Sequence, residues 1–407
     1  MQFNYQNLQT RKQKEARFLL LAKGCIFCAV LFLAILFLLI GNKAKKAFLS
    51  TKIALEINLI NQTNLQNLDY RQIIKNALNE QFINQLDNPD LSNINSVYQL
   101  ISKISNLELK KEIKNNQNLL GSKFLFWFSA SSKLDVAFKY NNQHNLNPLQ
   151  QKILQQLQEK QQIKTTFNWK FWQYGDSREP EIAGIASSLI GSLLTMLIFL
   201  LMAMPVAVAC GFYLEEFAKK TLFTNIIEVS LNNLVAVPSI IYGLLGLIIY
   251  LQTLKLPRSS SLVGGLTLFM LVLPIIIIAT RNAIRTVPKN IREAALGLGA
   301  SNVQIVLHHL LPLSLPGIMT GTILAVSRAL GETAPLIMIG MVAFIADIPQ
   351  KFSDPATVLP VQIYLWSDSQ ELGFAEKTSA AILVLLFFLI LLNLSAVLIR
   401  KKFEKKW

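Results

Sequence analysis

The sequence predicts an all-α integral membrane protein with six transmembrane helices and a mixed α/β domain between the first and second of them. Of the 407 residues, 52% are hydrophobic and only 15% are charged, and the mean hydropathy is +0.40. This composition is too apolar for an ordinary water-soluble protein. Six apolar stretches have about the 20 residues that a helix needs to cross a bilayer. One long hydrophilic segment separates the first stretch from the other five.

The six predicted spans follow from these apolar stretches. They are Phe18–Ile40, Ile182–Phe212, Ile226–Leu251, Leu262–Ala279, Ile318–Ile345 and Thr378–Ile399. Several contain proline, which we expect to be tolerated because neighbouring helices satisfy the backbone groups that it frees. The first span is expected to be retained, since no small-x-small cleavage site follows it. The domain boundaries are then 1–17, 18–41, 42–181, 182–399 and 400–407.

The net charge of +15 is distributed as in a membrane protein rather than a nucleic-acid-binding one, so we expect contact with membrane lipid and no nucleic acid. Basic residues cluster before the first span, after the fourth and after the sixth: Arg11, Lys12, Lys14 and Arg17; Arg281, Arg285, Lys289 and Arg292; Arg400, Lys401, Lys402, Lys405 and Lys406. The positive-inside rule places all three clusters, and both termini, in the cytoplasm. Lys43, Lys45 and Lys46 disagree with this topology, but they open a long domain, where the rule is weak.

The segment 42–181 is expected to fold outside the cytoplasm. It is rich in Asn and Gln, yet apolar residues recur at helical spacing between Ile73 and Phe82. Two apolar runs, 124–128 and 136–140, are expected to be strands. The ligand of this domain, if any, is not predicted by its residues.

The chain is not expected to be an enzyme or to bind a cofactor or metal ion. Its nearest approach to the phosphate-binding loop of ATPases, Gly121-Ser122-Lys123, lacks the upstream glycine and the strand–loop–helix setting. Cys25-x-x-Cys28 lies in an apolar span, and no second ligand pair accompanies it. His144 stands alone, with His308 and His309 on the other side of the membrane. The chain therefore does not hydrolyse ATP itself.

Residues 281–317, which we call the coupling loop, are predicted to form two short helices joined by a glycine turn. Pro288 suits the first turn of a helix. Gly297 and Gly299 are expected to stop that helix, because glycine readily adopts the left-handed conformation at helix ends. The second helix is expected to begin at a Ser301/Gln304 capping box and to end before Pro312. The alternative is an ordinary amphipathic loop. The small residues of the first helix, which would allow close approach of a partner, are Ala294 and Ala295.

Arg328 and Glu332 are predicted to lie within the fifth span, four residues apart on one helix face. Each charge costs at least about 2.5–3.5 kcal/mol near the bilayer centre, so such residues are paired or line a wet pathway. A guanidinium suits a tetrahedral oxyanion because it donates two parallel charge-assisted bonds to neighbouring oxygens. The carboxylate can hold the guanidinium in an empty pathway, or accept a proton from a protonated oxyanion. The same spacing also fits a buried ion pair that only orients helices.

Several motifs resemble those of permease subunits of ABC importers. One of them is more specific to a single class of these permeases than the others are. Residues spread over the coupling loop resemble the EAA loop of that family: Glu293, Ala294, Ala295, Gly299, Leu311 and Pro312. Arg328 followed by Gly331-Glu332-Thr333-Ala334-Pro335 resembles the fifth-span signature of phosphate-specific, PstA-type permeases. Runs that also fit are 175–180, 213–217, 237–243 and 359–364. The resemblance covers about residues 170–400, and residues 42–170 look like an extension that some members carry.

This resemblance implies a phosphate importer of the bacterial inner membrane. It implies a second related permease, two cytoplasmic ATPase subunits that use ATP and Mg²⁺, and a periplasmic phosphate-binding protein. Arg328, Glu332 and Thr333 would line the substrate pathway, and the residues of the EAA loop would contact the ATPase. A permease for molybdate, sulfate or phosphonate is the near alternative. A membrane sensor with residues 42–181 as its ligand domain is a more distant one.

Overall fold

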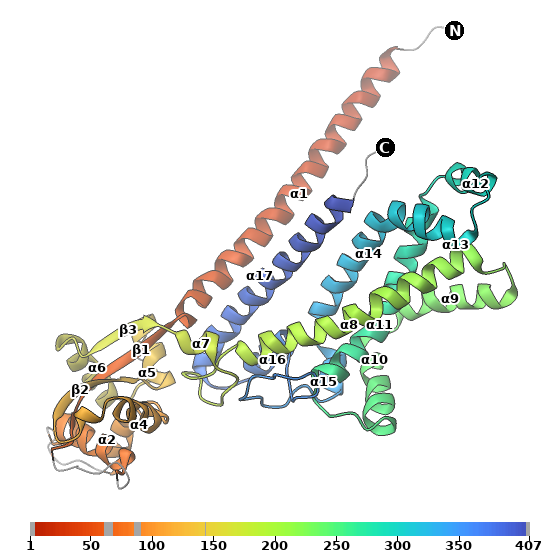
Figure 1. Ribbon diagram of the computed structural model, residues 1–407. Coiled ribbons are helices and arrows are strands. Elements are labelled where there is room, and N and C mark those ends of the chain that lie inside the picture. The colour runs from red at the N-terminus through yellow and green to blue at the C-terminus, as the bar shows by residue number, and fades with distance from the viewer. Residues whose placement is uncertain (1–4, 61–67, 85–90, 143, 404–407) are drawn as a thin grey trace.

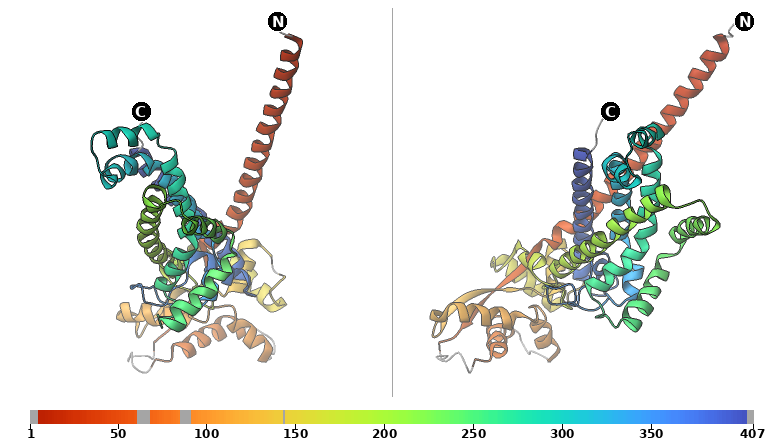
Figure 2. Two further views of the ribbon diagram at one scale, coloured as in Figure 1. Left: turned by 90° about the vertical axis from the view of Figure 1, so that its right-hand side faces the viewer. Right: turned by 45° about the vertical axis from the view of Figure 1, so that its right-hand side comes forward.

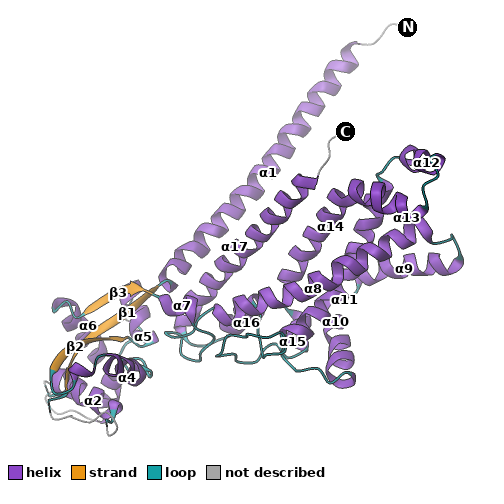
Figure 3. Ribbon diagram, in the orientation of Figure 1, coloured by secondary structure: helices purple, strands orange, loops and turns teal. Residues whose placement is uncertain are grey.

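The fold combines a small α/β domain at one end with long helices that lead away from it (Figure 1). The structure is a computed structural model that describes residues 5–60, 68–84, 91–142 and 144–403. Lys405 and Lys406 of the last basic cluster and residues 1–4 of the predicted N-terminal tail lie outside these ranges. Figure 3 shows that strands occur only in the small domain.

The α/β domain is built on a three-stranded antiparallel sheet with β1 in the centre, in the order β2-β1-β3. The strands are β1 (Leu49–Asn58), β2 (Lys123–Ser129) and β3 (Ile163–Phe167). Ile53, Leu55 and Ile57 alternate along β1 and are buried on one face of the sheet, where the helices cover them. Those helices and the short segments between them are α2 (Tyr70–Leu78), η2 (Asn79–Ile83), α3 (Leu91–Tyr98), α4 (Ser105–Asn115), η3 (Gln117–Leu119), α5 (Ser132–Tyr140) and α6 (Pro148–Glu159). The last helix of the segment, α7 (Trp169–Gln173), packs in a second core through Phe171.

One of the two strand predictions in this domain is confirmed and the other is wrong. Residues 124–128 lie in β2, but residues 136–140 form the second half of the helix α5. Leu134 and Ala137 are buried, and Phe138 packs against the same core. Spacings of three and four place these three side chains on one helix face, and this period outweighs the strand propensity of the apolar run.

The remaining elements are almost entirely helical. They are α1 (Tyr5–Ala47), α8 (Ala186–Phe212), η4 (Tyr213–Phe217), α9 (Leu222–Ala236), α10 (Ser239–Gly246), η5 (Leu247–Thr253), α11 (Ser261–Arg285), α12 (Lys289–Gly297), α13 (Asn302–Ile305), η6 (Val306–Leu310), α14 (Leu311–Gly331), α15 (Ala334–Met338), α16 (Leu359–Ser367) and α17 (Leu372–Phe403). In the described residues five helices are long and apolar enough to cross a membrane. The bent pair α9–α10 makes a sixth if it is one crossing.

Two predicted spans, 226–251 and 318–345, were wrong as single helices. The first is bent by 103° between α9 and α10, at Val237-Pro238. Proline has no backbone N–H, and it disfavours the helical conformation of the residue before it. The carbonyl of Leu234, whose usual partner four residues on is Pro238, accepts a hydrogen bond of 3.2 Å from the N–H of Val237 and one of 2.8 Å from the Tyr242 hydroxyl. The second predicted span ends early, at Gly331, and its helix begins instead in the coupling loop.

The elements are arranged so that α12, the start of α1 and the end of α17 lie at one end of the molecule. The α/β domain lies at the opposite end, as Figures 1 and 2 show from three directions. α1 packs along α17, whereas α8, α11 and α14 pack on one another around a core that includes Phe199, Val272 and Ala325. An even number of crossings is consistent with both chain ends lying on one side.

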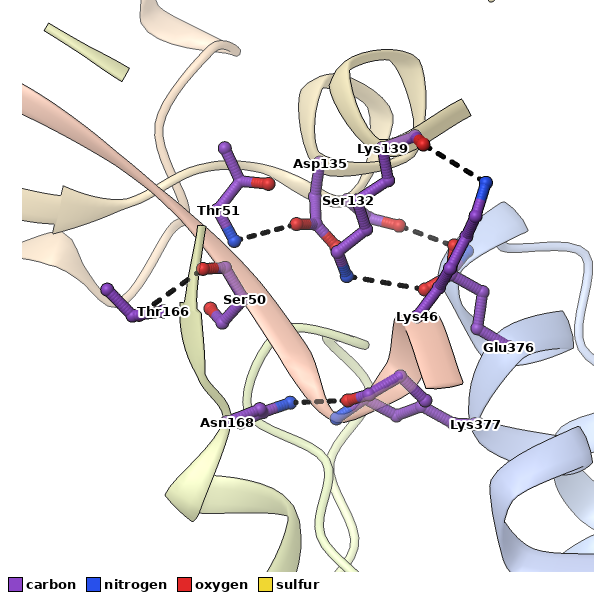
Figure 4. A network of polar contacts seen from close by, with 12 residues as sticks. Lys46, Ser50, Thr51, Ser132, Asp135, Lys139, Thr166, Asn168, Glu376 and Lys377 are labelled. Atoms are coloured by element: carbon purple, nitrogen blue, oxygen red, sulfur yellow. Dashed lines mark hydrogen bonds and ion pairs between the residues drawn. The ribbon is translucent and has the colours of Figure 1, made fainter. Parts of the chain in front are cut away.

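A buried polar cluster joins the α/β domain to the helices (Figure 4). We call it the joint. Lys139 of α5 pairs with Asp135 at 2.5 Å and with Glu376 of α17 at 3.3 Å, and its side chain is only 4% exposed. Lys377 donates to the carbonyl of Ala183. Lys46, at the end of α1, donates to the carbonyl of Lys139 at 3.0 Å. The joint therefore draws together the first helix, the last helix and the domain.

The joint also accounts for one of the lysines that disagree with the positive-inside rule. The Lys46 ammonium lies 3.2 Å from the centroid of the Tyr140 ring, close enough for a cation–π contact. Partial burial and the carboxylate of Glu376 raise the pKa of Tyr140 to about 12, so its phenol stays neutral. Lys46 thus has local partners that do not depend on the side of the membrane where it lies.

Replacing Lys139 by methionine is expected to weaken the joint by about 3–5 kcal/mol, because it leaves the buried carboxylates of Asp135 and Glu376 without their cation. The readout is amide hydrogen exchange of α5 and β1 in the solubilised full chain, which reports local opening. Lys103→Met is the matched control, since the Lys103 side chain is 80% exposed and its pair with Glu179 is solvated. Equal exchange in the two variants would contradict the prediction.

Candidate functional site

The helix that carries Arg328 breaks directly after it. α14 ends at Gly331, Glu332 has an extended backbone with φ −80° and ψ 114°, and α15 begins after Thr333. Pro335 explains the position of the break. Its ring would collide with the carbonyl of the residue four earlier, which is Gly331, and it has no N–H to bond that carbonyl. The break follows from the sequence between Gly331 and Pro335.

The packing of α14 on α11 shows where this break lies along the neighbouring helix. A side chain at Gly317 would meet Cβ of Ala283 at 2.7 Å, and one at Gly321 would meet Cβ of Ala279 at 2.1 Å. The two helices are therefore antiparallel, and each residue farther along α14 lies opposite one residue earlier in α11. Continued along both helices, this register places Arg328 opposite the region of Val272. Val272 is near the middle of α11, which spans 261–285. Arg328 and the break therefore lie level with the middle of α11, which is itself a candidate membrane span.

Arg328 and Glu332 are in contact, although they do not share a helix as predicted. The Arg328 Nε donates to Glu332 Oε1 across 3.5 Å, a long bond with i, i+4 spacing. The Arg328 side chain is 39% exposed and that of Glu332 is 19% exposed. The guanidinium is therefore not sealed in a core, and most of its donors remain free to bind a ligand or a neighbouring subunit.

Thr333 lies beside this pair, half-buried at the start of α15. The neighbouring helix α10 holds α15 at close range. A side chain at Gly243 would lie 2.7 Å from Cα of Pro335, so the two backbones are in direct contact. The run 237–243, noted in the sequence for its likeness to permeases, therefore supports the broken helix.

The predicted helix–turn–helix of the coupling loop is confirmed, with one correction. α12 begins after Pro288 and ends at Gly297, and Gly299 adopts a left-handed φ of +82°. Ser301 and Gln304 form the expected capping box. The second helix does not end before Pro312, however, but continues into α14. The reason is the π-helical turn η6, in which the Leu311 N–H reaches back to the carbonyl of Val306 and the backbone widens before the proline.

The two faces of the coupling loop differ from each other. Glu293 and Ala294 are exposed, whereas Ala295 is buried in the chain's own core with Ile284 and Leu310. Leu311 and Pro312 are half-buried in the first turn of α14. The six residues of the predicted EAA motif are therefore divided between a surface role and a packing role.

Sequence reasoning missed the apolar side chains that this loop exposes, which we call the apolar tip. Leu298 is 90% exposed, more than any other large apolar residue in the described ranges. The apolar tip consists of Leu296, Leu298, Val303 and Leu307. A signal for it was present, since four large apolar residues alternate with glycines and polar residues in a segment outside the spans.

A network of ion pairs fixes the coupling loop to the helices, and this too was missed. It joins the acidic residues of η4 and α9 to the basic cluster of α11 and α12. The pairs are Arg281–Glu215 at 3.2 Å, Arg281–Glu228 at 2.5 Å, Arg285–Glu215 at 2.8 Å and Arg292–Glu216. Arg281 and Glu216 are each only 9% exposed. A push on α12 would therefore be transmitted to α8, α9 and α11.

The pathway candidates and the coupling loop are not brought together. Leu311 and Arg328 lie 17 residues apart on one helix, which corresponds to roughly 25 Å. Among residues 5–60, 68–84, 91–142 and 144–403, no group of three His, Cys, Asp or Glu side chains could hold a metal ion. The geometry is that of a part-exposed arginine near one end of α14, with an exposed apolar loop at the other end of the same helix.

Comparison with known proteins gives the family. A family model described as the binding-protein-dependent transport system inner membrane component matches residues 182–407, more than half of the chain. The chain belongs to this family. Residues 5–147 match a second family model, described as a domain of unknown function (DUF3333), which covers α1 and much of the α/β domain. The resemblance to permeases stated from the motifs is thereby confirmed.

Relatives of this permease-family chain are similar to it over about half of its length or less. A "Phosphate transport system permease protein PstA" of Haemophilus influenzae is 32% identical over 214 residues, which are 53% of this chain and 74% of that protein. A protein of the same name from Pasteurella multocida is 28% identical over 53% of this chain and 76% of its own length. A "Probable ABC transporter permease protein YqgI" of Bacillus subtilis is 35% identical over 155 residues, 38% of this chain and 52% of its own.

Proposed function

We propose that this chain is a permease subunit of an ATP-driven importer that carries inorganic phosphate across the bacterial inner membrane. The observation that carries the proposal is the half-exposed Arg328 at a helix break level with the middle of the candidate membrane span α11, in a chain whose relatives are named phosphate transport permeases. A charge at this depth costs several kcal/mol unless it has a use or a partner. The pathway would be formed by Arg328, Glu332 and Thr333.

The chemistry of the pair suits a tetrahedral oxyanion that still carries a proton. With only Nε engaged, and by a long bond of 3.5 Å, the guanidinium can present a fork of two N–H donors to neighbouring oxygens. The Glu332 carboxylate can accept the proton of hydrogen phosphate. A fully ionised anion has no such proton to offer, so it would not gain this interaction. The same carboxylate steadies the guanidinium between transport events.

ATP hydrolysis belongs to separate subunits in this proposal. The apolar tip and the exposed Glu293 and Ala294 would lie in a groove of a cytoplasmic ATPase that uses ATP and Mg²⁺. Movement of that ATPase would push α12 as a rigid body, because the ion pair between Arg292 and Glu216 ties α12 to η4. The pairs of Arg281 with Glu215 and Glu228 then join η4, α9 and α11. A rigid push at one end of α14 reaches the break at the other, which is how a coupling loop can switch access at mid-membrane.

The topology follows from the same assignment. With the coupling loop in the cytoplasm, the start of α1 and the end of α17 are cytoplasmic too, and the α/β domain is periplasmic. Partners would be a second, related permease, two ATPase subunits and a periplasmic phosphate-binding protein. The side of α9 and α10 that is exposed in this chain offers apolar surface for the second permease, including the pocket between α8 and α9 lined by Cys210, Leu214 and Leu231.

Uptake of labelled phosphate by phosphate-starved cells that lack this chain tests the proposal. We expect the native chain to restore uptake, and unlabelled sulfate and molybdate to leave it unchanged. Restored uptake that these anions suppress would instead indicate a permease for a different oxyanion. No restoration, in cells shown to express the chain with its partner subunits, would remove the phosphate assignment.

A further inference from the structure

The short helix α7 presents three different faces, and one of them is largely exposed. Lys170 points into the α/β domain, where it pairs with Glu108 at 2.5 Å. Phe171 is fully buried between the rings of Phe48 and Trp366. The third face carries Trp169, which is 64% exposed, and Trp172, which is three residues on and therefore on the same side.

The neighbouring strand extends this face. Phe167, the last residue of β3, is half exposed, and its ring lies 4.8 Å from that of Trp169. Phe48 stacks on Trp172 with 5.8 Å between the ring centroids. We call Phe167, Trp169 and Trp172 the aromatic patch. Water is a poor environment for three large rings at one place, so the patch calls for an apolar or amphipathic neighbour.

The position of the patch along the molecule is fixed by the end of α1. The Asn168 side chain donates to the carbonyl of Ala47, the last residue of α1, and accepts from the N–H of Phe171 in α7. Phe167 pairs in the sheet with Leu49. α7 and the end of β3 are therefore bonded directly to the point where α1 ends.

The surface of α1 indicates what covers the patch. α1 is a candidate membrane span whose most apolar segment is not buried by the rest of the described chain. Phe32, Leu38 and Leu39 are each more than 60% exposed. A surface of this kind contacts lipid, and the patch continues it at the level where the helix ends. Tryptophan is enriched at that level because its ring is apolar and its indole N–H is polar.

We propose that the aromatic patch lies in the headgroup region of the bilayer and holds the α/β domain against the membrane surface. Lys43 and Lys45 of α1, both exposed on the turns before Ala47, are placed to reach lipid phosphates from the same level. The α/β domain is then held in two ways: the joint binds it to α1 and α17, and the aromatic patch binds it to lipid.

The test measures the environment of single labels in the full chain, reconstituted in vesicles of phosphatidylethanolamine and phosphatidylglycerol. Cys25, Cys28 and Cys210 are replaced by alanine, and a fluorescent maleimide is attached at Phe167→Cys or Trp169→Cys. Quenching by phospholipids brominated near the headgroup is compared with quenching by iodide in the water phase. The Phe167→Cys variant keeps both tryptophans. If losing Trp169 displaces the domain in the other variant, the label at 167 still reports the position of the patch.

Leu125→Cys is the matched control. Leu125 is 54% exposed in the same domain, but it pairs with Glu56, seven residues along β1 from Leu49. At about 3.3 Å per residue it lies roughly 23 Å farther from the end of α1. We expect brominated lipid to quench labels at 167 and 169, and iodide to quench the label at 125. Iodide quenching at 167 and 169 would overturn the proposal, and so would protection from both quenchers, which would mean that a protein covers the patch.

Discussion

Replacing Arg328 by glutamine is expected to abolish phosphate uptake while leaving the chain folded and bound to its ATPase. Glutamine keeps a polar group at the position but removes the charge and the fork of two N–H donors. At roughly 1.5–3 kcal/mol for each charge-assisted bond, losing two of them weakens binding in the pathway at least about 100-fold. The measurement is labelled-phosphate uptake in starved cells, together with recovery of the ATPase by affinity purification of the variant.

Two further variants separate a pathway role from a role in orienting helices. Arg328→Lys keeps the charge without the planar fork, so we expect weak uptake with a raised apparent KM. Arg71→Gln, on an exposed helix of the α/β domain, is expected to transport as the native chain does. Native uptake by Arg328→Gln would show that the ion pair with Glu332 serves only to hold the helix break, and the pathway would have to lie elsewhere.

Replacing Leu298 by aspartate is expected to release the ATPase subunits and so to eliminate uptake. Because Leu298 is 90% exposed, its replacement costs the isolated chain little, since surface changes are usually within about 0.5 kcal/mol. In an apolar groove of a partner, the new carboxylate would lose its water without gaining a counter-charge. The measurement is the amount of ATPase recovered with the solubilised variant.

Leu107→Asp provides the comparison, because Leu107 is a 60% exposed leucine in the α/β domain. It should recover as much ATPase as the native chain. Ala295→Asp should differ from both, since Ala295 is 6% exposed and a charge there would destabilise the loop itself. Full ATPase recovery with Leu298→Asp would exclude the apolar tip as the docking surface.

The six predicted spans match the described helices in number only if the bent pair α9–α10 is counted as one crossing, and the effect of each proline could not be predicted. Pro238 bends the chain by 103°, Pro335 ends a helix at Gly331, and Pro312 is absorbed in a widened turn. What decides between these outcomes lies elsewhere in the chain. Near Pro238, the Tyr242 hydroxyl donates a second hydrogen bond to the carbonyl of Leu234, and no local pattern in the sequence predicts such a bond.

The direction in which each residue of the predicted coupling loop points could not be predicted from the sequence. The alanines of the coupling loop follow one another in sequence, yet Ala294 faces outward while Ala295 packs against Ile284 of another helix. Only the packing of α12 on its neighbours fixes this direction. The ion pairs of Glu215 and Glu216 with the basic cluster could have been predicted, because the six-span topology already places both groups on one side of the membrane.

The distance along the chain between the members of the joint orders its assembly during synthesis. Lys139 and its partner Glu376 are 237 residues apart, and Glu376 stands near the start of the last helix. The ribosome therefore releases the α/β domain and five of the six candidate crossings before the final carboxylate of the joint exists. Until α17 arrives, Lys139 and Asp135 lie in an open recess at the end of the domain. A chain that stops short of α17 would lack the carboxylate of Glu376 and so would leave Lys139 with Asp135 as its remaining ion-pair partner in the joint.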